Sequence, residues 1–239
     1  MGAKIRICKI IPVAKGLENW GPLHEELLAE IAHDGVKVVQ VDLPDVAVTS
    51  ISSKYECDIV APAHTQAALR AEAEGFDAVA MGCLMEPGVS AAKELLQIPV
   101  VGEAQASMHL AALVARKFSF VGGGARKRKG GSDLVRQYGF SDHVASRRGV
   151  GVASLAFAGE EQGLAELMIN AARLAIEEDG AQAIVGYGGL AVIGAMRRAL
   201  QVPVISPIQA SVIVAEMLVR ARLSQSKVAF PRPSRLAGD

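Results

Sequence analysis

The residue best placed for a catalytic role is Cys83, which follows the apolar run Ala78–Met81. A helical pattern begins after Glu86-Pro87-Gly88, so this stretch predicts a strand, a tight turn and a helix. Open α/β sheets bind ligands at the carboxyl ends of their strands, where this cysteine would lie. The following helix N-terminus is expected to lower the thiol pKa toward neutrality. A thiolate there could be a nucleophile or a base that removes a proton next to a carbonyl, and the alternative is a structural cysteine.

The stretch around Cys83 recurs 104 positions later, where Leu96–Val101 (LQIPVV) reappears as Leu200–Ile205 (LQVPVI). Carried back without a gap, the repeat aligns Tyr187 with Cys83. Aligned from the upstream strand alone, it places Gly188 there instead. A duplicated half predicts a pseudo-twofold cleft with Cys83 on one wall and the Tyr187-Gly188 turn on the other. Since the pKa of a free tyrosine is about 10, Tyr187 is expected to be a proton donor or an oxyanion partner.

Strands and helices alternate along the chain, which predicts an α/β fold of two similar, doubly wound parallel sheets of Rossmann-like type. The first half is expected to cover residues 1–103, completed by a C-terminal helix within about 207–239, and the second half residues 104–206. Residues 42–53 read as an irregular loop, residues 62–74 as a helix, and residues 149–154 as a weak strand.

Composition excludes several classes of function. Lys plus Arg and Asp plus Glu number 25 each, so no overall field favours nucleic acid or a membrane surface. Apolar runs stay well short of the roughly 18 residues of a membrane span, and the first residues lack a secretory signal pattern. Three cysteines without CxxC spacing argue against a disulfide framework and a zinc site. We therefore expect a cytoplasmic protein with no metal site and with no nucleic-acid or membrane partner.

Gly122–Gly124 precedes the basic run Arg126–Lys129, and two interpretations stay open. The glycines and basic side chains could bind a carboxylate or phosphate, or the segment could be a solvated loop. The dinucleotide pattern GxGxxG is not matched. His64 and His109 are expected to be core or helix-face histidines.

Segments in both halves resemble the aspartate/glutamate/hydantoin racemase superfamily, and within it the hydantoin and allantoin racemase branch. They are Ala71–Val79, Gly82–Gly88, Ile98–Ala104, Met108–Ala112, Glu177–Ala181 and Val202–Ile205. The resemblance implies a cofactor-independent isomerase acting on amino acids or their derivatives, often oligomeric. It also implies one cysteine from each half, on opposite faces of the acidic carbon of the substrate.

The sequence departs from the family pattern at several positions. Tyr187 stands in place of the second cysteine, within Gly-Tyr-Gly-Gly-Leu, and glycines from Gly122 replace a Thr-Thr pair. The motif around Pro12 has lost its amide and hydroxyl, and Leu84 stands where an aromatic residue is common. The resemblance implies Cys83 and Tyr187 as catalytic residues. It implies substrate contacts at Pro12, Leu84, Gly122, Gly123, Gly188 and Gly189.

The expected function is therefore a racemase in which Cys83 removes a proton next to a carbonyl group. One alternative is a one-thiol decarboxylase or lyase similar to arylmalonate decarboxylase, which protonates a carbanion from one side. Another is a non-catalytic small-molecule binder on the same fold. A homo-oligomer is expected from the resemblance alone.

Overall fold

The computed structural model describes residues 4–123, 133–152 and 163–234. The chain divides into two compact units. The first contains residues 1–21, 31–103 and 211–239, and the second contains residues 22–30 and 104–210.

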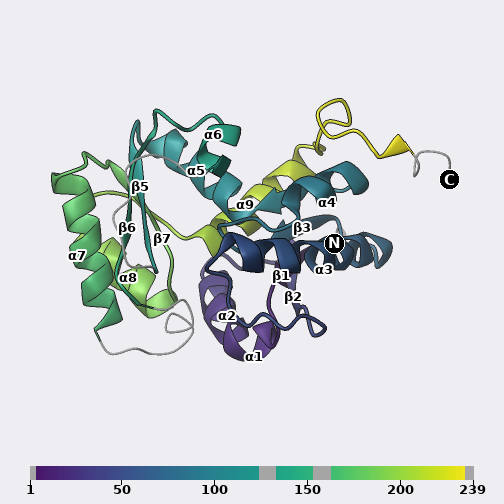
Figure 1. Ribbon diagram of the computed structural model, residues 1–239, viewed down its shortest axis with the longest axis horizontal. Helices are drawn as coiled ribbons and strands as arrows, with labels where there is room; N and C mark the ends of the chain where they lie inside the picture. The colour runs from purple at the N-terminus through teal and green to yellow at the C-terminus, as the bar shows by residue number, and fades with distance from the viewer. Residues whose placement is uncertain (1–3, 124–132, 153–162, 235–239) are drawn as a thin grey trace. The chain divides into compact units, whose positions relative to one another are not determined.

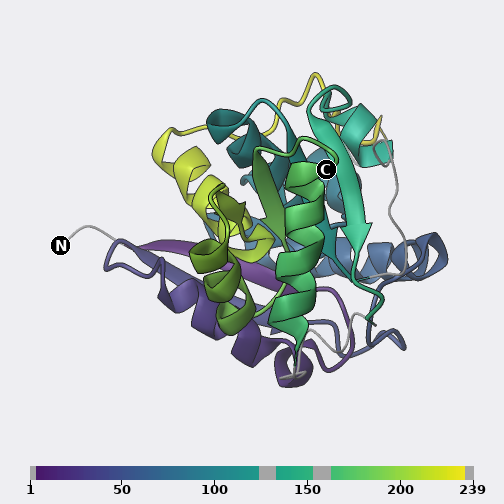
Figure 2. The same cartoon turned by 90° about the vertical axis from the view of Figure 1, so that its left-hand side faces the viewer.

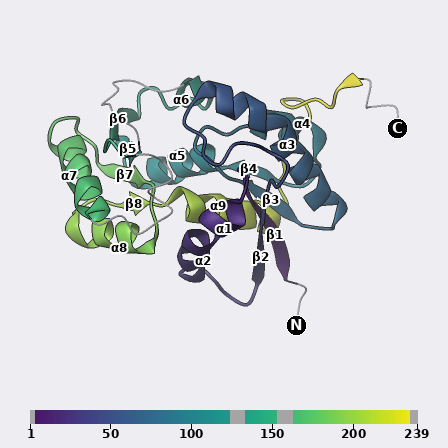
Figure 3. The same ribbon diagram turned by 60° about the horizontal axis from the view of Figure 1, so that its bottom comes forward.

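The first unit is built on a four-stranded parallel sheet in the order β2-β1-β3-β4. Its strands are β1 (Ile5–Ile11), β2 (Val36–Asp42), β3 (Ala78–Met81) and β4 (Val100–Gly102). Figure 3 shows β1 and β2 side by side near the N-terminus. Its helices are α1 (Gly16–Asn19), α3 (Lys54–Ala73), α4 (Val89–Leu95) and most of α9 (Pro207–Arg220).

Alternation along β1 determines what each sheet face contacts. Cys8 and Ile10 share a buried apolar cluster with side chains of α3 and α4. Cys8 is 1% exposed and packs as a small hydrophobic residue. Lys9 points to the other face of the sheet, because neighbouring residues in a strand face opposite sides.

The second unit repeats the strand order of the first, as β6-β5-β7-β8, again all parallel. Its strands are β5 (Phe118–Gly122), β6 (Val144–Gly149), β7 (Ala183–Gly186) and β8 (Val204–Ile205). Its helices are α2 (Gly21–Ala29), α5 (Glu103–Val114), α6 (Asp133–Gln137), α7 (Leu164–Glu177) and α8 (Leu190–Ala199). In Figure 1, α7 lies on one side of these strands and α5 on the other. In Figure 2, α7 faces the viewer with α8 packed beside it. The predicted α/β fold with two parallel sheets is confirmed.

Two predicted elements differ in extent. The helix predicted over 62–74 begins at Lys54 and contains Pro62 inside it. It is capped by Ser53, whose hydroxyl accepts the Glu56 N–H while the Glu56 carboxylate accepts the Ser53 N–H. The strand predicted over 149–154 was placed too late in the sequence, because β6 covers Val144–Gly149 and residues 150–152 are not in a strand. Residues 153 and 154 lie outside the described part of the chain. Across the residues that the structure describes, no helix is long and apolar enough to cross a membrane.

Candidate active site

The first sheet presents Pro12, Cys83 and Glu103 at the carboxyl ends of β1, β3 and β4. Strand pairing brings these ends together. The approach is closest at Gly82, where a Cβ atom would lie 2.6 Å from the carbonyl oxygen of Ile10 and 3.0 Å from Cδ of Pro12. Only glycine lets the chain pass here, so Gly82 is what allows Cys83 to leave the sheet beside Pro12.

Residues 82–88 form the irregular turn that holds the thiol. Cys83 and Glu86 have backbone φ angles of +77° and +51°, which residues other than glycine rarely adopt. The Glu86 N–H donates to the Cys83 carbonyl at 3.0 Å, and the Met85 N–H donates to Cys83 Sγ at 3.4 Å. Leu84 lies in the same turn and is partly exposed, like Cys83. Strained backbone of this kind clusters at active sites, so the turn is the strongest candidate in the first unit.

The expected lowering of the Cys83 pKa is wrong. Burial raises the pKa of this thiol from 9.0 to about 12, and the nearby charges of Glu103 and Glu86 raise it too, against the hydrogen bond from Met85. The helix after Cys83 begins only at Val89 and is short, whereas a helix dipole acts within its first turn. The thiol is therefore neutral at pH 7. It is ready to donate a proton and has to lose one before it acts as a base.

A buried ion pair lies beneath this edge. Lys9 Nζ lies 2.6 Å from Glu103 Oε1 and donates to Ser211 Oγ at 3.1 Å. The side chains of Lys9 and Glu103 are both 0% exposed. Because the Glu103 carboxylate raises the Cys83 pKa, the pair belongs to the electrostatic surroundings of the thiol.

One member of this pair can be recognised from the sequence. In the strand Ile5–Ile11, Lys9 falls on an inward-facing position between Ile7 and Ile11. A lysine at such a position is almost never fully buried unless it is paired. The partner could not be found in the same way, because Glu103 lies far away in sequence.

The second sheet places Gly122 and Tyr187 next to each other at its carboxyl edge. The Tyr187 N–H donates to the Val121 carbonyl at 3.2 Å. A Cβ atom on Gly122 would lie 3.8 Å from Cβ of Tyr187. Gly123 follows directly and is exposed. These three predicted residues therefore share one edge of the second unit.

Gly188 and Gly189 connect this edge to α8. A Cβ atom on Gly188 would lie 2.9 Å from Cγ1 of Val192, so the turn leaves no room for a side chain there. Gly189 is the residue before the first turn of α8. The tight turn predicted after the second repeat strand is present. The predicted placement of Cys83 opposite Tyr187 (or Gly188) across one cleft stays a prediction.

Ser206 is a further residue at the carboxyl edge of the second sheet, directly after β8. It is 3% exposed, and its hydroxyl has no hydrogen-bond partner among the described residues. Nothing in the sequence distinguishes Ser206, because a serine before a helix is usually a capping residue.

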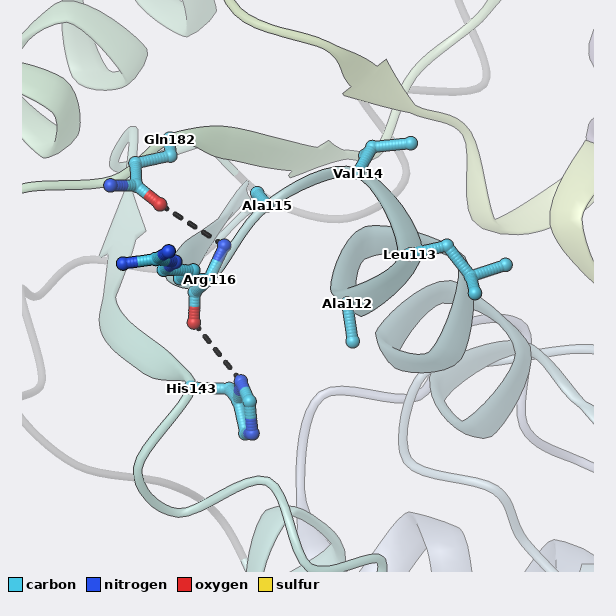
Figure 4. A pocket seen from close by; sticks show the side chains of 7 residues that line it. All are labelled: Ala112, Leu113, Val114, Ala115, Arg116, His143 and Gln182. Carbon is cyan, nitrogen blue, oxygen red and sulfur yellow. Dashed lines mark hydrogen bonds between the residues drawn. The ribbon is translucent and has the colours of Figure 1, made fainter.

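A separate shallow pocket of about 480 Å³ lies on the second unit (Figure 4). It is lined by Ala112, Leu113, Val114, Ala115, Arg116, His143 and Gln182. Gln182 and His143 precede β7 and β6, so this pocket lies at the amino ends of the strands. The backbone N–H and carbonyl of Arg116 are already paired. The Arg116 N–H donates to Gln182 Oε1, and the Arg116 carbonyl lies 3.0 Å from His143 Nδ1. The predicted site residues of the second unit are at the opposite edge of this sheet.

Within 4–123, 133–152 and 163–234, no group of His, Cys, Asp or Glu side chains has the arrangement of a metal site. The basic run Arg126–Lys129 lies outside the described residues.

Comparison with known proteins identifies the family of the chain. The pattern of the family described as Asp/Glu/Hydantoin racemase matches residues 22–220. A hydantoin racemase from Paenarthrobacter aurescens is 39% identical over 170 residues, which cover 69% of this chain and 72% of that protein. A hydantoin racemase from Rhizobium meliloti is 32% identical over 221 residues and covers 90% of both chains.

Solved structures show the same fold. An allantoin racemase from Klebsiella pneumoniae superimposes with a TM-score of 0.83 at 30% identity, over 97% of this chain and 94% of that chain. Unliganded arylmalonate decarboxylase superimposes with a TM-score of 0.59 at 17% identity, over 90% of this chain and 92% of that chain, which shows a shared fold only.

Proposed function

Because the chain belongs to the Asp/Glu/hydantoin racemase family, we propose that it is a racemase whose Cys83 removes the proton next to a carbonyl group of a hydantoin-like substrate. One observation supports this role most strongly. Cys83 is the partly exposed cysteine, and it lies in a strained turn at the carboxyl edge of a parallel sheet.

The reaction requires two proton transfers. The Cys83 thiolate takes the proton from the carbon, and the bonding electron pair moves onto the carbonyl oxygen to give an enolate. A proton delivered to the other face of that carbon completes the inversion. We assign this delivery to the Tyr187 hydroxyl. The Tyr187 phenolate then takes a proton from water, and the hydroxide so formed takes the proton from Cys83, which restores both groups.

The raised pKa of Cys83 predicts the pH dependence of this reaction. With a pKa of about 12 in the free enzyme, the thiolate fraction rises about tenfold for each pH unit between 7 and 10. The rate of racemisation, expressed as kcat/KM, should rise in the same way.

The neutral thiol also favours a second candidate function. A one-thiol decarboxylase or lyase needs Cys83 as a proton donor to a carbanion, and the neutral thiol is already in that form. The replacement of the second family cysteine by Tyr187 fits such a one-sided reaction. A non-catalytic binder stays the third possibility.

Isotope exchange in heavy water distinguishes these functions. A single enantiomer of a 5-substituted hydantoin, or of allantoin, is incubated with the protein, and both deuterium uptake and optical rotation are followed. A racemase labels and inverts the substrate. An arylmalonate tests the alternative, because a decarboxylase labels only the product. A protein that does neither with any of these compounds is not the enzyme proposed.

Two substitutions test the assigned roles. Tyr187→Phe should abolish inversion but leave exchange of the proton removed by Cys83. Cys83→Ser should reduce exchange by more than the roughly 10²–10⁴-fold typical of a general base, since the thiol also adjoins the developing charge. If Tyr187→Phe still exchanges the substrate proton on both faces of the carbon, a residue other than Tyr187 acts on the second face.

The expected compartment and assembly also stay proposals. All three cysteines are free thiols, which supports a reducing cytoplasm. The homo-oligomer expected from the resemblance is tested by light scattering of the purified protein.

A further inference from the structure

The turn that carries Cys83 needs support from outside itself. Cys83 and Glu86 both adopt left-handed backbone conformations, which are energetically unfavourable for residues other than glycine. Such conformations persist only where the surrounding structure holds them. The hydrogen bonds inside the turn are those from Glu86 and Met85 to Cys83, described above.

One face of α3 supplies that support. Three of its side chains, Cys57, His64 and Thr65, point at carbonyl groups of the turn. Their spacing of seven and eight residues places them on one face of the helix. Cys57 Sγ donates to the carbonyl of residue 85 at 3.6 Å, and the Thr65 hydroxyl lies 3.3 Å from the carbonyl of residue 88.

The hydrogen bond from His64 is the shortest of the three. Its Nδ1 lies 2.8 Å from the carbonyl oxygen of Pro87, and since a carbonyl only accepts, Nδ1 carries the hydrogen. His64 is 0% exposed, and burial lowers its pKa to about 3, so the ring stays neutral and keeps this donor across the working range of pH. Thr65 is the weaker contact, because its hydroxyl is shared with the carbonyl of Ala61 at 2.9 Å.

The turn and α3 also fit closely at Gly88. A Cβ atom there would lie 2.5 Å from Oγ1 of Thr65 and 2.6 Å from the carbonyl oxygen of Ala61. Gly88 has a φ of +73°, so both its conformation and its contact with the helix require glycine. The turn is thus fixed against α3 by contact as well as by hydrogen bonds.

We propose that His64 is a positioning residue for the reaction, which acts by holding the turn of residues 82–88 so that the Cys83 thiol faces the substrate. The inference rests on the proposed role of Cys83. His64 itself is buried behind the turn and exchanges no proton with the substrate.

The experiment compares His64→Leu with His64→Asn. The asparagine amide can replace the Nδ1 donor, whereas leucine keeps apolar volume and removes the hydrogen bond. His109→Leu is the matched control, since His109 also bonds a carbonyl through Nδ1 but is exposed on α5. Thr65→Val is a second variant of nearly unchanged size, used if His64→Leu does not fold.

We expect His64→Leu to lower kcat by about 10–100-fold with little change in KM, because a misplacement of about 1 Å can cost 10²-fold. His64→Asn should recover most of that loss, and His109→Leu should lose nothing. Unchanged kcat in a folded His64→Leu protein would overturn the proposal, as would equal losses in the leucine and asparagine variants. For Thr65→Val we expect a smaller fall in kcat, and unchanged kcat in this variant would count against the proposal.

A second readout separates this proposal from the proposed function. The rate of Cys83 alkylation by iodoacetamide, followed from pH 7 to 10, needs no substrate. His64→Leu should change this profile and His64→Asn should restore it, even if Cys83→Ser were to retain activity and so disprove the catalytic role of the thiol. A profile that is the same in wild type and His64→Leu would overturn the positioning role alone.

Discussion

Replacement of Lys9 by Met tests the buried ion pair of the first unit most directly. Lys9 Nζ lies 2.6 Å from Glu103 Oε1 and 3.1 Å from Ser211 Oγ, in a region closed to solvent. Methionine keeps the apolar stem and removes the ammonium group. The Glu103 carboxylate would then be buried without this cation.

The expected loss follows from two opposing energies. At an effective dielectric constant of about 20, unit charges 2.6 Å apart attract by about 6 kcal/mol. Burial costs several kcal/mol for each ion, so the intact pair contributes little net stability. When Lys9 is removed, the cost of burying the Glu103 carboxylate is no longer offset by attraction to the ammonium group. We therefore expect Lys9→Met to lower the free energy of unfolding by about 3–5 kcal/mol.

The assay is urea unfolding followed by the fluorescence of Trp20. This residue is the one tryptophan of the chain, and it is buried in the first unit, like Lys9. Lys54→Met is the matched control, because Lys54 pairs with Asp58 on the surface of α3 in the same unit. Loss of an exposed pair of this spacing should lower the free energy of unfolding by only about 0.3–0.5 kcal/mol.

A double variant completes the test. Lys9→Met combined with Glu103→Leu removes both charges and should regain most of the lost stability, because an apolar pair can replace a buried ion pair. The reasoning is refuted if Lys9→Met loses no more stability than Lys54→Met, or if the double variant is less stable than Lys9→Met alone.

Three further predictions follow from the same unit. Iodoacetamide should label Cys83 before the buried Cys8 and Cys57, at a rate that rises about tenfold per pH unit from 7 to 10; equal labelling of all three would contradict this. Burial raises the pKa of Cys8 from 9.0 to about 12, so the stability that its neutral thiol contributes is present below pH 9 and is lost between pH 9 and 12. As the pH rises over that range, the free energy of unfolding should fall less in Cys8→Ala than in the wild type. An equal fall in both proteins would contradict this prediction. A Cβ atom on Gly102 would lie 2.2 Å from Glu86 Oε1, so Gly102→Ala should lower the free energy of unfolding by about 1–3 kcal/mol. Adding Glu86→Ala should restore most of the lost stability. If the double variant is no more stable than Gly102→Ala, the strain does not come from the contact with Glu86.

The fold was readable from the sequence because periodicity and repetition are local properties. Apolar runs at Ala78–Met81 and Ala183–Gly186 became central strands of two sheets with the same strand order. The start of α3 was missed because Pro62 suggested a helix boundary, although Ser53 and Glu56 have the spacing of a capping box. A proline can lie inside a helix where packing compensates for the lost hydrogen bond.

The candidate site was only partly predictable. The position of Cys83 follows from its strand, but its pKa depends on burial and on Glu103 and Glu86, which the fold brings near it. Lys9 was visible as an inward-facing charge, whereas its hydrogen bond to Ser211 spans 202 positions of sequence. Contacts over such separations depend on tertiary structure, which local patterns do not encode.

The position of Ser211 also constrains the order in which the protein can fold during synthesis. The first unit contains both ends of the chain, since residues 211–239 join residues 1–21 and 31–103. On a ribosome, β1 to β4 emerge first, while the α9 hydroxyl that binds Lys9 is made only after all of the second unit. Until α9 has been synthesised, one face of the first sheet is incompletely covered. Nascent chains with such exposed apolar surface aggregate or bind chaperones. The early half of this protein therefore becomes native last.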